Sequence, residues 1–116
     1  MRTILVADDY PGMRRLLSGI LRREGFRVVT VSSASGLLKK WKALRCRVVL
    51  SDIEMPGELD GIQACRDIRR MAPNVKAFLM TGDSRGRERA RRSGFQIAFL
   101  KPFTLEAVRR WARRVG

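Results

Sequence analysis

The chain has 116 residues, the size of one ordinary domain with a single hydrophobic core, so we expect one domain over residues 1–116. Its 45% hydrophobic and 31% charged residues exclude a disordered chain. No apolar stretch approaches the roughly 20 residues that span a bilayer, so we expect a cytoplasmic protein without membrane insertion. The chain has no histidine and no CxxC pair, which excludes a zinc site and leaves carboxylates, hydroxyls and lysine for its chemistry.

Short apolar runs alternate with amphipathic stretches along the whole chain. The runs predict strands at residues 4–7, 27–31, 47–50, 76–80 and 97–100, and their continuous hydrophobicity is typical of strands covered on both faces. The amphipathic stretches predict helices at residues 12–25, 34–44, 60–71, 84–93 and 104–115. Gly25 is expected to end the first helix, and the other four begin near Ser33, Asp60, Ser84 and Thr104, which we expect to cap them.

This strand–helix pattern, repeated five times, predicts an α/β fold. Right-handed crossovers between consecutive strands give a doubly wound five-stranded parallel sheet with helices on both faces. We expect the flavodoxin-like strand order 2-1-3-4-5, in which ligands bind at the carboxyl ends of the strands where the order reverses.

Polar residues follow the carboxyl ends of four predicted strands. Asp8 and Asp9 follow the first strand, Asp52 the third, Thr81 the fourth and Lys101 the fifth. Carboxylates crowded at one sheet edge cannot all ionise cheaply, and a hard divalent cation such as Mg²⁺ relieves their repulsion. The sequence therefore predicts a magnesium site here, with a hydroxyl and a lysine beside it.

Four motifs in order, "ILVADD", "SDIEMP", "TG" and "KPF", resemble the receiver domain of two-component response regulators, of the chemotaxis-regulator kind. The resemblance covers nearly the whole chain. It implies that Asp52 is the phosphoacceptor, and that Asp9, Asp52 and the backbone carbonyl of Glu54 ligate Mg²⁺, while Asp8 holds the metal through water.

The resemblance also implies that Thr81 and Lys101 bind the phosphoryl oxygens, and that the peptide bond before Pro102 is cis. The phosphodonor would be a phosphohistidine on a histidine kinase or a histidine phosphotransfer protein. A carboxylate can attack phosphorus once Mg²⁺ and lysine mask the negative charges. We therefore expect a signalling domain that catalyses its own phosphorylation and slow dephosphorylation, not a turnover enzyme.

Two positions depart from the family pattern. Ala98 stands where many members carry the aromatic residue whose rotation reports phosphorylation, and strand alternation predicts that Phe99 faces the opposite side and does not substitute. Tyr10 stands where an acid is common, which predicts lower metal affinity.

Three other functions would be compatible with parts of this pattern. A flavodoxin-like electron carrier is disfavoured because "DDYPG" would repel flavin phosphate, and a dehalogenase-type phosphatase because its nucleophile motif is Asp-x-Asp. A receiver fold that acts as a phosphorylation-independent binding module, possibly on nucleic acid, remains the alternative.

The positive charge is concentrated in residues 84–116, which carry a local net charge of +8 out of +14. Nine arginines and Lys101 stand there against Glu88 and Glu106. This basic face of the fourth and fifth helices should disfavour symmetric pairing, so we expect a monomer that docks an acidic output protein, with nucleic acid as the lesser option.

Overall fold

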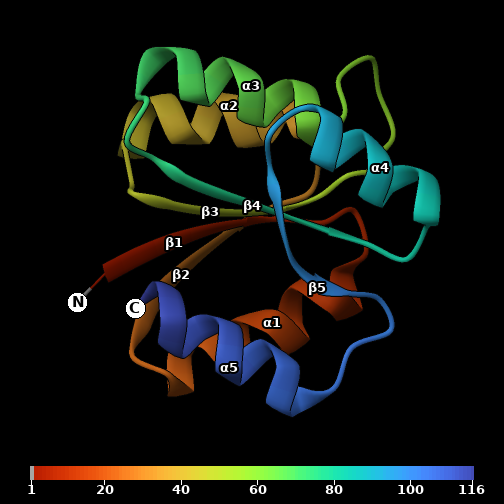
Figure 1. The fold of residues 1–116 in the computed structure, drawn as a ribbon. Coiled ribbons are helices and arrows are strands. Elements are labelled where there is room, and N and C mark those ends of the chain that lie inside the picture. The colour runs from red at the N-terminus through yellow and green to blue at the C-terminus, as the bar shows by residue number, and fades with distance from the viewer. Residues whose placement is uncertain (1) are drawn as a thin grey trace.

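The structure of the protein is a computed structural model that describes residues 2–116, and Figure 1 shows its five strands and five helices. The strands are β1 (Arg2–Ala7), β2 (Phe26–Val31), β3 (Val48–Asp52), β4 (Lys76–Thr81) and β5 (Gln96–Leu100). The helices are α1 (Pro11–Arg23), α2 (Ala34–Leu44), α3 (Gly61–Met71), α4 (Ser84–Arg92) and α5 (Leu105–Val115). Each predicted element is confirmed, with ends that shift by at most two residues.

The sheet is parallel throughout and has the predicted order β2-β1-β3-β4-β5. Helices α2, α3 and α4 cover one face, and α1 and α5 cover the other (Figure 1). Strands β1 and β3 are neighbours in the middle of the sheet, although α1, β2 and α2 separate them in the chain. The strand order therefore reverses beside β1, where the fold is expected to form its site.

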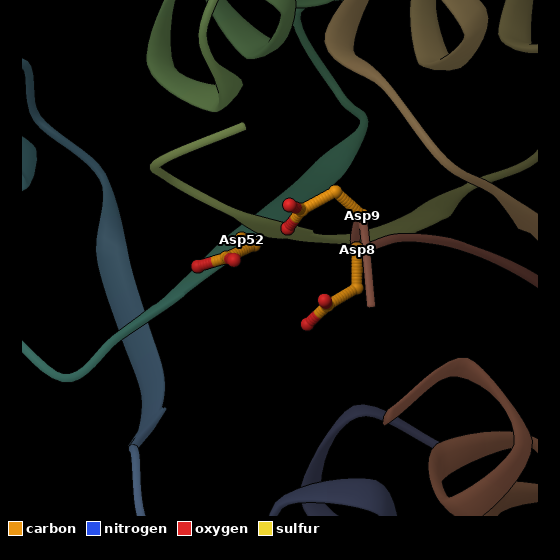
Figure 2. Close-up of side chains that lie close together, drawn as sticks. All are labelled: Asp8, Asp9 and Asp52. Atoms are coloured by element: carbon orange, nitrogen blue, oxygen red, sulfur yellow. The ribbon is translucent and has the colours of Figure 1, made fainter. Parts of the chain in front are cut away.

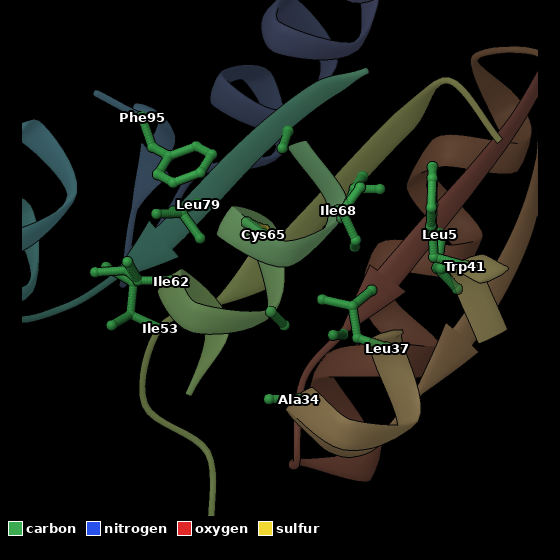
Figure 3. Close-up of a cluster of buried hydrophobic side chains, with 14 of the residues drawn as sticks. Leu5, Ala34, Leu37, Trp41, Ile53, Ile62, Cys65, Ile68, Leu79 and Phe95 are labelled. Carbon is green, nitrogen blue, oxygen red and sulfur yellow. The ribbon is translucent and has the colours of Figure 1, made fainter. Parts of the chain in front are cut away.

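A hydrophobic core lies on each side of the sheet. Figure 3 shows the core under α2 and α3, where Leu5 and Leu79 of the sheet are fully buried together with Leu37, Trp41 and Ile68 of the helices. The other core packs Trp111 of α5 against Phe78 and Phe99 of the sheet, with ring centroids 5.3 and 5.9 Å apart. Both faces of the sheet are therefore covered, as is typical of a parallel sheet.

The predicted caps of three helices are confirmed. The side chains of Ser33, Asp60 and Thr104 accept hydrogen bonds from the first turns of α2, α3 and α5. The prediction for α4 is wrong by one residue, because Asp83 caps this helix and Ser84 is its first residue. An ionised carboxylate also interacts more favourably with a helix N-terminus than a hydroxyl does.

Strand β5 contains an irregularity that the sequence does not reveal. Leu79 pairs with Ile97, but Met80 pairs with Phe99, so Ala98 has no partner in the register. The shift breaks the alternation of side chains, and Ala98 and Phe99 pack against the same core beneath α1 and α5. The expectation that Phe99 faces away from Ala98 is therefore wrong.

Among residues 2–116, no helix is long and apolar enough to cross a membrane. Cys46 and Cys65 are free thiols.

Candidate functional site

The three aspartates come together because β1 and β3 are adjacent and end at the same edge. Ala7 pairs with Ser51 in the register, so the residues that follow Ala7 lie beside Asp52 (Figure 2). Asp8, Asp9 and Asp52 each offer a carboxylate oxygen, and these three oxygens lie within 4.8 Å of one another. Asp8 and Asp52 are buried, whereas Asp9 is exposed.

Lys101 reaches this cluster from the loop after β5. Its Nζ lies 2.6 Å from Oδ2 of Asp8 and 3.2 Å from Oδ2 of Asp52. The backbone N–H of Lys101 donates to the carbonyl of Thr81 at 2.9 Å, which fixes the loop against the end of β4. The peptide bond to Pro102 is cis, as the resemblance implied.

The charges in this cluster do not balance. Burial raises the pKa of Asp52 to about 6; the nearby Lys101 lowers it, and the negative charge of Asp8 adds to the rise. Burial acts to lower the pKa of Lys101, but its hydrogen bond to Asp8 and the charge of Asp52 outweigh this effect, so that pKa is raised. Lys101 therefore forms ion pairs with two buried carboxylates at once, and Asp9 is a third acid beside them.

A divalent cation fits this donor set. Three carboxylates within reach of one point are the oxygen ligands that Mg²⁺ prefers. The raised pKa of Asp52 also shows that Lys101 alone does not offset the cost of its ionised form. Additional positive charge at this point would stabilise the ionised state of the site.

Thr81 lies at the end of β4, fully buried, between the cluster and α4. Its Oγ1 accepts a hydrogen bond from the N–H of Asp83 at 3.1 Å and donates to the carboxylate of Glu54 at 3.5 Å. Gly86 of α4 packs against this hydroxyl so closely that a Cβ on it would lie 2.5 Å from Oγ1. The first turn of α4 thus rests directly on Thr81.

Further residues shape the site without having been predicted from the sequence. The N–H of Tyr10 donates to Oδ1 of Asp8 at 3.0 Å, and Arg14 donates to the Asp8 carbonyl at 2.8 Å, so both ends of Asp8 are fixed. Gly61 lies against the backbone of Asp52, where no side chain would fit. Because Gly61 directly follows the cap Asp60, the sequence predicts that a helix begins there. It does not predict that Gly61 approaches the backbone of Asp52 closely.

Comparisons with known proteins agree with this geometry. Residues 4–113 match the sequence profile of the response regulator receiver domain. The chain is 30% identical over 105 residues to the chemotaxis protein CheY of Thermotoga maritima, covering 88% of this chain and 87% of that protein. It is also 32% identical over 108 residues to the sensor histidine kinase RcsC of Salmonella typhi, covering 91% of this chain but spanning only 11% of that much longer protein.

Among solved structures, the response regulator TrrA of Thermotoga maritima in complex with Mg²⁺ and BeF superimposes with a TM-score of 0.89 at 29% identity, and both chains are covered completely. Receiver domains generally bind Mg²⁺ at an acidic pocket and interact with histidine kinases and output domains. Fold, acidic cluster and sequence profile agree: the chain belongs to the response regulator receiver domain family and is a signalling domain of two-component systems.

Proposed function

We propose that residues 1–116 form a single cytoplasmic receiver domain in which Asp52 accepts a phosphoryl group from the phosphohistidine of a histidine kinase or a histidine phosphotransfer protein. The observation that carries the proposal is the position of the buried Asp52 carboxylate, 3.2 Å from Lys101 Nζ and beside Asp8 and Asp9. In this position the carboxylate is close to the positive charge that a phosphoryl dianion needs.

The transfer forms one bond and breaks one. A carboxylate oxygen of Asp52 attacks the phosphorus in line with the leaving imidazole, the O–P bond forms, and the P–N bond breaks with its electron pair passing to the imidazole nitrogen. The amine of Lys101 can move its ion pair from the carboxylates to the phosphoryl oxygens. Thr81 can turn its hydroxyl from Glu54 towards a phosphoryl oxygen, since the 3.5 Å contact is weak.

Mg²⁺ would be held by Asp9, Asp52 and the backbone carbonyl of Glu54, with Asp8 bound through water. When bound, it supplies the charge that neutralises the carboxylates and the incoming phosphoryl oxygens. The hydrogen bonds that Asp8 receives from Tyr10 and Lys101 keep its carboxylate in place for this role. The same residues would position the water that slowly hydrolyses the acyl phosphate, so the domain catalyses its own reactions and acts on no metabolite.

Labelling with acetyl phosphate and Mg²⁺ followed by intact-mass spectrometry tests the assignment. We expect a gain of one base-labile phosphate, which Asp52→Asn abolishes and which Asp67→Asn on α3 leaves unchanged as a matched control. Asp9→Ala should remove the Mg²⁺ dependence because it deletes a direct ligand. Labelling that persists in Asp52→Asn would rule out Asp52 as the acceptor.

We further propose that the phosphorylated domain is a monomer that docks an acidic output protein on the face formed by α4 and α5. Five of the nine arginines of residues 84–116 form ion pairs, with Asp60, Glu88 or Glu24. Ion pairs are absent within residues 2–116 for the other four, which are Arg85, Arg87, Arg110 and Arg114. These four leave positive charge available to a carboxylate-rich partner.

Charge reversal of an α4 and an α5 arginine, Arg85→Glu with Arg110→Glu, should abolish binding to that partner in a pull-down at physiological salt. A tight dimer of the wild type through these helices would contradict the proposal. Partner binding that Asp52→Asn and beryllofluoride both leave unchanged would instead support the phosphorylation-independent binding module.

A further inference from the structure

The opposite edge of the sheet carries a second and less compensated concentration of positive charge. Residues 10–47, which form α1, β2, α2 and the turns beside them, contain ten basic residues and a single acid, Glu24. The basic residues are Arg14, Arg15, Arg22, Arg23, Arg27, Lys39, Lys40, Lys42, Arg45 and Arg47. β2 is the edge strand opposite β5, while α1 lies beside α5 on the same face of the sheet (Figure 1).

Carboxylates do not neutralise this edge. Within the described part of the chain, none of its ten basic residues takes part in an ion pair. Glu24 is occupied by Arg109 and Arg113 of α5, at 3.4 and 3.1 Å. The excess charge at the β2 edge is therefore available to a partner.

A groove of about 360 Å³ between α1 and β2 gathers three of these arginines. Arg14, Ser18 and Arg22 follow one another at intervals of four residues, which places them in a row about 12 Å long on one side of the helix. Arg15 and Thr30 complete the polar lining. Arg14 is held at one end of the row by its hydrogen bond to the carbonyl of Asp8.

The lining indicates the chemistry of the ligand. Guanidinium groups and hydroxyls without a carboxylate match phosphate oxygens, which arginine binds through two parallel hydrogen bonds. The groove has no large apolar side chain in its lining, in contrast to the groove on the other side of α1, which Leu16, Ile20 and Leu105 line. An acidic amphipathic helix would need such an apolar floor, whereas a sugar–phosphate backbone does not.

We propose that the α1–β2 groove binds the phosphate backbone of nucleic acid without reading its sequence. A row of about 12 Å spans several consecutive phosphates of one strand of a duplex, which follow one another at about 3.4 Å along the axis. The remaining arginines and lysines of this edge add long-range attraction. This binding is separate from the phosphorylation of Asp52 and does not depend on it.

Fluorescence anisotropy with two unrelated duplex DNAs of about 20 base pairs, in about 50 to 300 mM salt, tests the proposal. We expect similar affinities for both sequences and a steep loss of affinity as salt rises. The double variant Arg15→Gln with Arg22→Gln should weaken binding about tenfold and make the slope of log K against log salt shallower by about 2. Both residues are exposed and form no ion pair within residues 2–116, so the fold should be retained.

The matched control removes the same charge elsewhere, with Arg110→Gln and Arg114→Gln on α5, and should change affinity by less than about threefold. Ser18→Glu, which places one carboxylate in the middle of the groove, should weaken binding as strongly as the double variant. Equal losses in the two double variants, no binding at about 50 mM salt, or displacement by poly-glutamate at lower concentration than by DNA would each overturn the proposal.

Discussion

The acidic site and the α4–β5 region lie on either side of Thr81, and they differ in how far they follow the pattern of the family. At the site, Asp8, Asp9, Asp52 and Lys101 all lie where the sequence motifs place them. In the α4–β5 region, Ala98 stands where an aromatic residue is expected, and the register between β4 and β5 shifts at this position. The acidic site therefore matches the motifs of the family, whereas the α4–β5 region departs from its pattern at Ala98.

The aromatic residues near Ala98 are packed in the hydrophobic cores. The ring of Phe99 packs edge-on against Phe103 and Trp111, with centroids 4.9 and 5.9 Å away, and is buried beneath α5. The same ring borders a groove of about 550 Å³ between α4 and β5, whose apolar lining is Phe95, Ile97, Phe99 and Leu100. The two rings in its lining, those of Phe95 and Phe99, are both buried in the cores of the domain.

One close packing contact and one ion pair still connect α4 to the site. Gly86 packs on the Thr81 hydroxyl, which also touches Glu54. Arg89 of α4 forms an ion pair with Asp60, the cap of α3 in the same loop region as Glu54. These contacts offer a route from Asp52 to α4 that needs no aromatic ring.

The largest effect is expected at Lys101, because its amine is the cation that lies between Asp8 and Asp52. Lys101→Met leaves two buried carboxylates without their counter-charge and should lower the free energy of unfolding by about 2–4 kcal/mol in the absence of Mg²⁺. Phosphorylation by acetyl phosphate should slow by at least about 100-fold. Urea unfolding and mass spectrometry measure the two effects.

Lys76→Met provides the control for this substitution, since Lys76 is exposed at the start of β4 and forms no ion pair within residues 2–116. It should leave both quantities nearly unchanged. Equal stability of the two variants would mean that the lysine at the site balances no buried charge.

The contact between α4 and Thr81 can be broken by adding one methyl group. Gly86→Ala would place Cβ 2.5 Å from Thr81 Oγ1 and 3.1 Å from Oε1 of Glu54, so the helix must shift, and we expect a loss of about 1–3 kcal/mol in stability. Gly19→Ala in α1 is the matched control, because nothing lies within 4 Å of its added Cβ. This variant should gain about 0.5–1 kcal/mol from helix propensity. Thermal unfolding measures both, and a neutral Gly86→Ala would show that α4 does not rest on Thr81.

The sequence predicted the site better than it predicted the region that reports on it. Asp52 and Lys101 could be placed because strands that end at one sheet edge bring their next residues together, whatever the details of packing. The position of Phe99 could not, since strand alternation fails at a register shift that depends on how β5 pairs with β4. The role of Gly86 was hidden for a similar reason: a glycine inside a helix shows that space is needed, but not against which residue.

The raised pKa of Asp52 predicts a smaller effect on stability, which depends on pH. The pKa rises from 3.8 to about 6 on folding because of burial, so the protonated carboxyl stabilises the folded state below pH 3.8, and this contribution is lost as the pH rises to about 6. Without Mg²⁺, Asp52→Asn should therefore be more stable than the wild type at pH 7.5 by roughly 1–2 kcal/mol, and not at pH 4.

Thermal unfolding at the two pH values measures this difference, and Asp67→Asn serves as the control because Asp67 is not part of the cluster. Mg²⁺ should raise the melting temperature of the wild type at pH 7.5 and have little effect on Asp52→Asn. A stability advantage of the variant that is the same at both pH values would contradict the assignment of the raised pKa to Asp52.

The smallest effect is expected in the α4–β5 region itself. Beryllofluoride with Mg²⁺, which takes the place of the phosphoryl group, should shift the amide resonances next to Asp52 and Thr81 strongly but those of residues 84–110 only weakly. The physical reason is that Ala98 has no ring to move and that Phe99 is packed between Phe103 and Trp111. NMR spectra of the wild type and Arg89→Gln would test the contribution of the ion pair between Arg89 and Asp60. Its loss should reduce the weak shifts in α4 further and leave the shifts at Asp52 unchanged. Shifts across residues 84–110 as large as those at Asp52 would show that the domain transmits its signal without an aromatic switch and without the separation of regions inferred from the structure.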